Sequence, residues 1–66
     1  MIDLLVRDEG SVVVFQPVSQ AAREWIEYNV CSEPWQWLGD SLAVDHRYAP
    51  ILIQGAAEAG LGVASE

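Results

Sequence analysis

The chain has 66 residues and a formal net charge of -7, because ten acidic residues face three arginines and no lysine. This length leaves room for one hydrophobic core, so we expect a single domain over residues 1–66. Affinity for nucleic acid depends mainly on lysine and arginine neutralising phosphates, so the composition argues against direct nucleic-acid binding and against attraction to an anionic membrane surface.

The sequence also predicts where the protein is found. Cys31 is the only cysteine, which excludes a disulfide within one chain. No basic and then apolar leader is present, and the longest near-apolar run, "APILIQGAA", is about half as long as a membrane-spanning helix needs to be. We therefore expect a soluble protein in the reducing cytoplasm.

Two β-rich runs, "IDLLVR" and "VVVFQ", begin the chain and are separated by "DEGS". This pattern predicts a hairpin in which Gly10 occupies a position that needs a positive φ. Pro17 ends the second strand because it cannot donate a hydrogen bond to a neighbouring strand. Ser19 then follows as the predicted N-cap of a helix.

A helix is predicted from Gln20 to about Val30 because apolar residues recur every four positions. The expected inward residues, with Trp25 beside them, are Val18, Ala22, Ile26 and Val30. Polar residues fall on the other side, namely Gln20, Arg23, Glu24 and Glu27. Tyr28 is expected on the flank of this helix, half exposed.

A second hairpin is predicted where "WQWL" and "SLAVD" flank Gly39 and Asp40, since glycine at the first position of a two-residue loop favours a type II′ turn. In that register Trp37 lies opposite Leu42, and Trp35 lies opposite Val44. Alternation places these four side chains on one face, so we expect both tryptophans to pack beneath the helices. The alternative is that one of them lies at the domain edge and anchors a partner.

The last helix is carried by "HRYAPILIQGAAEAG". Because proline is tolerated only in a first turn, either the helix begins near Ala49 or Asp45 caps an irregular opening turn. Gly60 is the predicted left-handed C′ residue, with Leu61 folding back against the helix. The expected inward stripe, with Ile51 and Ile53 on either side of it, is Tyr48, Leu52, Ala56 and Ala59.

These elements predict an α+β fold: a small two-layer domain with a mainly antiparallel sheet and two helices on one face. The order is β-β-α-β-β-α, and "LGVAS" is a candidate for a short final strand.

Three segments, "FQPVSQAAREW", "LGDSLAVDHRY" and "GAAEAGLGV", resemble a group of short, uncharacterised bacterial and prophage-borne proteins. Their shared pattern is a strand, a capped helix with a tryptophan, an aromatic-Gly-Asp hairpin and an Arg-Tyr helix start. The resemblance spans Phe15 to Val63 and implies no activity. Pro50 departs from the pattern.

Residues that could carry catalysis are few. Cys31 and His46 fall in separate predicted elements, and nothing supplies an oxyanion hole. His46 has no histidine or cysteine at a spacing typical of zinc sites. We therefore expect no catalytic residue, no metal and no cofactor, and we interpret the chain as non-enzymatic.

Two functions remain open. The first is a small acidic protein-binding or regulatory module. Its negative charge either serves solubility alone or attracts a partner with a basic surface, and the sequence leaves both open. The second is an inhibitor, encoded by a phage or mobile element, whose carboxylates mimic nucleic acid in a basic site. A homodimer through the last helix or an edge strand is also expected. The candidate partner-binding residues are Trp35, Trp37, Tyr28, Ile51, Ile53, Glu24 and Glu27.

Overall fold

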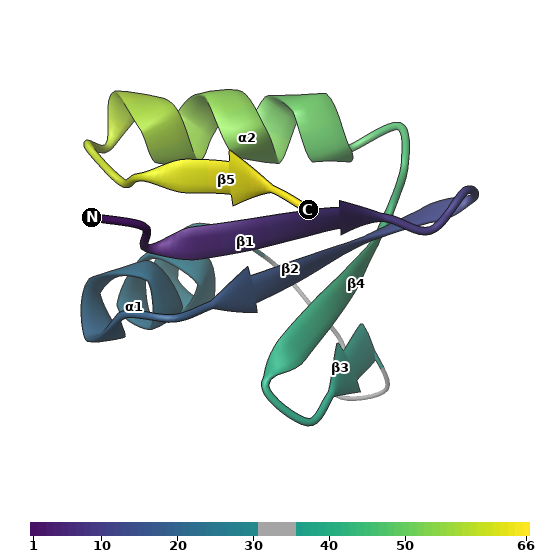
Figure 1. Cartoon of the computed structure of the whole chain (residues 1–66), viewed down its shortest axis with the longest axis horizontal. Coiled ribbons are helices and arrows are strands. Elements are labelled where there is room, and N and C mark those ends of the chain that lie inside the picture. The colour runs from purple at the N-terminus through teal and green to yellow at the C-terminus, as the bar shows by residue number, and fades with distance from the viewer. Residues whose placement is uncertain (31–35) are drawn as a thin grey trace.

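The computed structural model describes residues 1–30 and 36–66, which form one sheet and two helices (Figure 1). The elements, in chain order, are β1 (Leu4–Asp8), β2 (Val12–Pro17), α1 (Gln20–Asn29), β3 (Trp37–Leu38), β4 (Ser41–Asp45), α2 (Ala49–Glu58) and β5 (Val63–Ser65). The order β-β-α-β-β-α-β confirms the predicted α+β fold, including the short final strand.

The five strands lie in the order β3-β4-β2-β1-β5. All neighbours are antiparallel except β1 and β5, which are parallel. The predicted hairpin of β1 and β2 is confirmed: Asp8 lies opposite Val13, and Gly10 has a φ of 93°. The Asp8 carboxylate accepts a 2.8 Å hydrogen bond from the Gly10 amide and so fixes this turn.

The hairpin of β3 and β4 has the register that the sequence predicts. Trp37 lies opposite Leu42, Leu38 lies opposite Ser41, and Gly39 has a φ of 65°. The paired part of β3 is only two residues long, although the Gln36 side-chain amide also donates to the Ala43 carbonyl. The predicted pairing of Trp35 with Val44 lies outside the described residues.

Helix α1 begins as predicted, because the Ser19 hydroxyl accepts a 3.1 Å hydrogen bond from the Ala22 amide. Ala22 and Ile26 are buried, and Trp25 and Val30 pack against the core. Two expectations for this region were wrong in detail. Val18 is exposed rather than inward, since it precedes the helix cap, and Tyr28 is almost fully exposed rather than half exposed.

Helix α2 begins at Ala49, so Pro50 lies in its first turn. Amides of the first turn have no acceptor within the helix, so the missing N–H of proline removes no hydrogen bond there. Asp45 does not cap this helix; its carboxylate accepts a hydrogen bond from the Arg47 amide in the turn before it. The helix ends as predicted: Gly60 has a φ of 87°, and the Gly60 and Leu61 amides donate to Ala57 and Ala56. These two bonds form a Schellman motif.

The inward face of α2 is rotated from the predicted stripe. Its core residues, at a spacing of three and four, are Ala49, Leu52, Ile53 and Ala56. Tyr48 and Ala59 are exposed instead, because the helix begins one residue after Tyr48 and ends one residue before Ala59. The Trp25 ring of α1 reaches α2 at Gly55, where an added Cβ would lie 3.3 Å from the ring.

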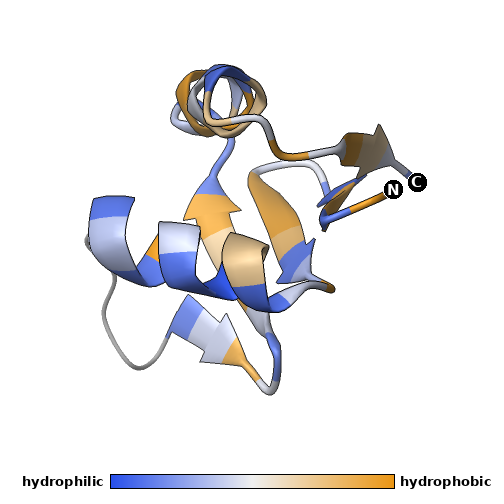
Figure 2. Cartoon of the chain, turned by 90° about the vertical axis from the view of Figure 1, so that its left-hand side faces the viewer, coloured by the Kyte–Doolittle hydropathy of each residue, from blue (hydrophilic) through white to orange (hydrophobic). Residues whose placement is uncertain are grey.

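The core lies between the helices and one face of the sheet. Its sheet residues, which come from alternate positions of β1, β2 and β4, are Leu4, Val6, Val13, Phe15, Leu42 and Val44. Both helices contribute side chains to this same core, which confirms that they cover one face of the sheet. Figure 2 shows the two helices and the sheet from the side. No described helix packs on the other face of the sheet.

Candidate partner-binding surface

The described residues offer little for catalysis. Within residues 1–30 and 36–66, no three histidine, cysteine or acidic side chains are grouped so that they could hold a metal ion. His46 is exposed in the turn after β4. Cys31, the other residue of the pair considered from the sequence, lies outside the described residues.

A hollow of about 490 Å³ lies where the end of α1 meets β4 and the start of α2. Its apolar lining comes from Val30, Val44 and Leu52, and its further lining residues are Asn29, Gln36, Asp45, Tyr48 and Ile51. A concave apolar lining with polar groups among its residues is typical of surfaces that receive a side chain of another molecule.

Large apolar side chains are exposed beside this hollow. Tyr48 and Ile51, at the start of α2, are each 64% exposed. Tyr28 of α1 is 92% exposed and precedes Asn29, which lines the hollow. Tyrosine combines a large contact area with a hydroxyl that stays hydrated, and for that reason it is common at the centre of protein interfaces.

Two carboxylates lie on α1 together with Tyr28. Glu24 and Glu27 are exposed, and Glu24 accepts a 3.1 Å hydrogen bond from the side-chain amide of Gln20, one helical turn earlier. We call the group formed by Glu24, Glu27, Tyr28, Tyr48 and Ile51 the helical surface. It joins exposed aromatic and aliphatic side chains to negative charge.

The arginines do not cancel this charge, since each is engaged by another carboxylate. Arg23 lies 3.5 Å from Asp40 at the tip of the β3–β4 hairpin, and Arg7 lies 3.6 Å from Glu9. Arg47 binds Asp45 through two side-chain hydrogen bonds of 3.1 Å. Those bonds and one from the Arg47 amide lower the pKa of Asp45 to about 2.

The residues that the sequence predicted for partner binding differ in their exposure. Tyr28, Ile51, Glu24 and Glu27 are exposed. Trp37 and Ile53 are partly buried and pack against the core, so their first role is structural. Trp35 lies outside the described residues. Tyr48 was missed because it was assigned to the inward stripe; the signal was Pro50, which delays the helix until after Tyr48.

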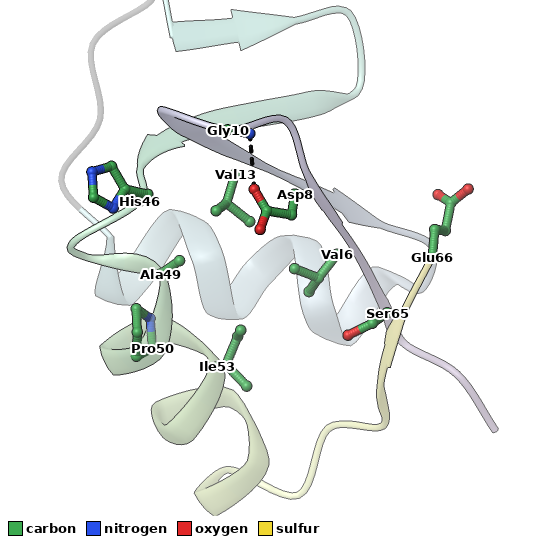
Figure 3. Close-up of a pocket in the computed structure, with 10 residues that line it drawn as sticks. All are labelled: Val6, Asp8, Gly10, Val13, His46, Ala49, Pro50, Ile53, Ser65 and Glu66. Carbon is green, nitrogen blue, oxygen red and sulfur yellow. Dashed lines mark hydrogen bonds between the residues drawn. The ribbon is translucent and has the colours of Figure 1, made fainter.

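A second hollow, of about 390 Å³, lies between α2, the β1–β2 hairpin and the end of β5 (Figure 3). Val6, Val13 and Ile53 supply its apolar lining, and Asp8 is the carboxylate that Figure 3 shows bound to Gly10. The Asp8 carboxylate is therefore already engaged in a hydrogen bond within the β1–β2 turn. Ser65 and His46 also line this hollow but lie at opposite ends of it in Figure 3, and no metal-ligand group is found among the described residues.

Comparison with known proteins adds no relative: no protein-family model, curated protein or solved structure matches the chain significantly. The resemblance to short bacterial and prophage-borne proteins therefore stays a prediction. Among the described residues, neither helix has the length and apolar character needed to cross a membrane.

Proposed function

We propose that the protein is a small, acidic, non-enzymatic module that binds a protein partner with a basic surface in the cytoplasm. The observation that carries this proposal is the helical surface. Its two tyrosines and its isoleucine are exposed, whereas the core is made of other residues of the same helices. Aromatic anchors supply most of the binding energy in such contacts, while charge around them steers the partner and sets specificity.

The charge of the molecule supports a basic partner. The net charge of -7 raises the rate of encounter with a positive surface, and the carboxylates of Glu24 and Glu27 belong to the same helix as Tyr28, one of the proposed anchors. None of the three arginines lies on the helical surface as a free cation, since each is paired elsewhere. The partner would therefore meet aromatic rings bordered by negative charge.

The alternative, an inhibitor that mimics nucleic acid, requires carboxylates in a row at about the spacing of phosphates. The placement of the acids gives it less support. Glu9 and Asp40 belong to the tips of two different hairpins, and each has an arginine partner, while Glu58 lies on α2. This spread favours the binding module.

Affinity capture with the tagged protein tests the proposal. The wild-type chain should retain one protein from an extract of its host, and the retained amount should fall as salt is added, because screening weakens charge attraction. Tyr28→Ala and Ile51→Ala should each reduce retention by at least about tenfold, the effect expected of an interface anchor.

Charge-matched variants separate local from overall charge effects. Glu24→Gln with Glu27→Gln removes two charges from the helical surface, whereas Glu9→Gln with Glu58→Gln removes two charges from elsewhere. The first pair should weaken capture more than the second. Equal retention by all four variants and the wild type would contradict the proposal.

A further inference from the structure

The hollow between α2, the β1–β2 hairpin and the end of β5 combines apolar and acidic lining residues (Figure 3). Val6 and Val13 are core residues of the sheet, and Ala49 and Ile53 belong to the inward face of α2. The volume of about 390 Å³ lies near the lower end of the range of about 300–1,000 Å³ that ligand pockets span, so it suits one long side chain. The apolar part of the lining favours an aliphatic group.

One carboxylate oxygen of Asp8 remains open to a ligand. The Oδ1 atom accepts the hydrogen bond from the Gly10 amide, whereas nothing within residues 1–30 and 36–66 binds Oδ2. Asp8 follows the buried Val6 by two positions in β1, so its side chain lies on the core side of the sheet and lines the hollow (Figure 3). Oδ2 can therefore accept a hydrogen bond from a donor that enters the hollow.

The charge around the hollow is negative. Glu66 adds a second carboxylate to the lining, and the one basic residue described there, His46, forms no ion pair with it or with Asp8. The amino end of α2 at Ala49 also borders the hollow, and its partial positive charge of roughly +0.5 favours an anion. Two full negative charges exceed that partial charge, so the hollow complements a cation.

We propose that this hollow receives a lysine side chain of the basic partner, an inference that rests on the proposed function. The methylene groups of the lysine lie along Val6 and Ile53, and its ammonium group donates to Oδ2 of Asp8. Long cationic side chains bury their stems along apolar surface in this way. Lysine suits the site better than arginine, because a guanidinium favours a bidentate contact and the Gly10 amide already occupies one of the two oxygens.

The start of α2 connects the hollow with the helical surface. Pro50 lines the hollow, and the next residue, Ile51, belongs to the helical surface and is 64% exposed. One partner that covers the start of α2 can therefore contact both. The lysine site would supply a charged contact beside the aromatic and aliphatic anchors.

NMR titration with N-acetyl-lysine methylamide tests the hollow without the partner. At millimolar concentration this probe should shift the methyl signals of Val6, Val13 and Ile53. The matched norleucine derivative, which lacks the ammonium group, should bind about threefold more weakly or worse at equal ionic strength. Asp8→Asn should raise the Kd of the lysine probe about threefold or more, because asparagine keeps an acceptor for the turn but removes the charge. Glu9→Gln removes a charge outside the hollow and should leave the Kd unchanged.

Capture of the partner supplies the second arm of the test. Asp8→Asn should reduce the amount of partner retained, and Glu9→Gln should not; both positions are exposed, so both variants should stay folded by circular dichroism. If the wild type retains no partner, the proposed function fails, while the titration still decides whether the hollow binds lysine. Methyl signals that do not move, or a lysine probe that binds Asp8→Asn as tightly as the wild type, would overturn the lysine site even where capture succeeds.

Discussion

The carboxylate of Asp3 accepts a 2.8 Å hydrogen bond from the backbone amide of Gly62, 59 residues further along the chain. The Asp3 and Leu4 amides return hydrogen bonds to the Gly62 carbonyl, at 2.8 and 3.0 Å. Gly62 accommodates this contact because a Cβ there would collide with the Met1 carbonyl. This exchange positions β5 beside β1 and joins the two ends of the described chain.

Replacing Asp3 tests that exchange. Asp3→Ala should lower the melting temperature because it leaves the Gly62 amide without its acceptor, while Asp3→Asn, which keeps an acceptor oxygen, should lower it less. Hydrogen bonds from the Gly62 amide and the Ser19 hydroxyl lower the pKa of Asp3. The contribution of the Asp3 carboxylate to stability is therefore complete above the ordinary aspartate pKa of 3.8 and is lost as pH falls through the lower pKa of the folded state.

Thermal melts at neutral pH and near pH 2 check this expectation. The melting temperature of Asp3→Ala should lie furthest below that of the wild type at neutral pH, and the gap should shrink on acidification. A difference that is the same at both pH values would show that the carboxylate charge contributes nothing to the contact.

Arg47→Ala should raise the pKa of Asp45. The side-chain hydrogen bonds from Arg47 are the largest cause of its low value of about 2, and the backbone amide of residue 47 is the second. The amide remains in the variant, so the pKa should rise without reaching the ordinary 3.8. Carboxyl NMR titration measures it directly, and an unchanged value would mean that the ion pair does not form in solution.

Gly39→Val should destabilise the fold by about 1–3 kcal/mol, because a β-branched residue strongly disfavours a positive φ. Nothing lies within 4 Å of a Cβ placed at Gly39, so the cost comes from the backbone rather than from a collision. Gly39→Asn is the matched control and should cost less, since asparagine tolerates positive φ better. Denaturant unfolding measures the free energy of unfolding of the wild type and both variants. If Gly39→Val is as stable as the wild type, residue 39 does not have a positive φ and the predicted turn is wrong.

Trp37 and Leu38 are neighbours on opposite faces of the sheet, so their truncation separates core from surface. Trp37→Ala should cost about 2–4 kcal/mol because the ring packs against the core, although it is only partly buried. Leu38→Ala should cost less than about 0.5 kcal/mol in the monomer, as is usual for an exposed site. Unfolding at low protein concentration measures both, and equal costs would contradict the register of β3.

The sequence predicted the elements well because their signals are local. Ser19, Gly10, Gly39 and Gly60 each fix a turn or a helix end through their own conformation or a neighbouring amide. The inward face of α2 was predicted with an error because a stripe of apolar residues depends on where the helix begins. A start at Ala49 turns Ile53 inward and leaves Ile51 and Tyr48 exposed.

Long-range features were not predictable in the same way. Nothing in the sequence around Asp3 distinguishes it from other surface carboxylates, and only the fold brings it to Gly62. The core side of the sheet likewise depends on the register, since alternation along one strand does not say which face the helices cover. Four of the seven nominated binding residues, Glu24, Glu27, Tyr28 and Ile51, are exposed because polarity or helix position already placed them outward.

The central claim is that the helical surface receives a protein partner. The most direct test is chemical-shift mapping by NMR on the labelled protein during titration with the captured partner. We predict that the shifts concentrate at Tyr28, Tyr48 and Ile51 and spare Leu5 and Val14. Shifts concentrated at Leu5 and Val14, with Tyr28 and Ile51 unchanged, would contradict the claim.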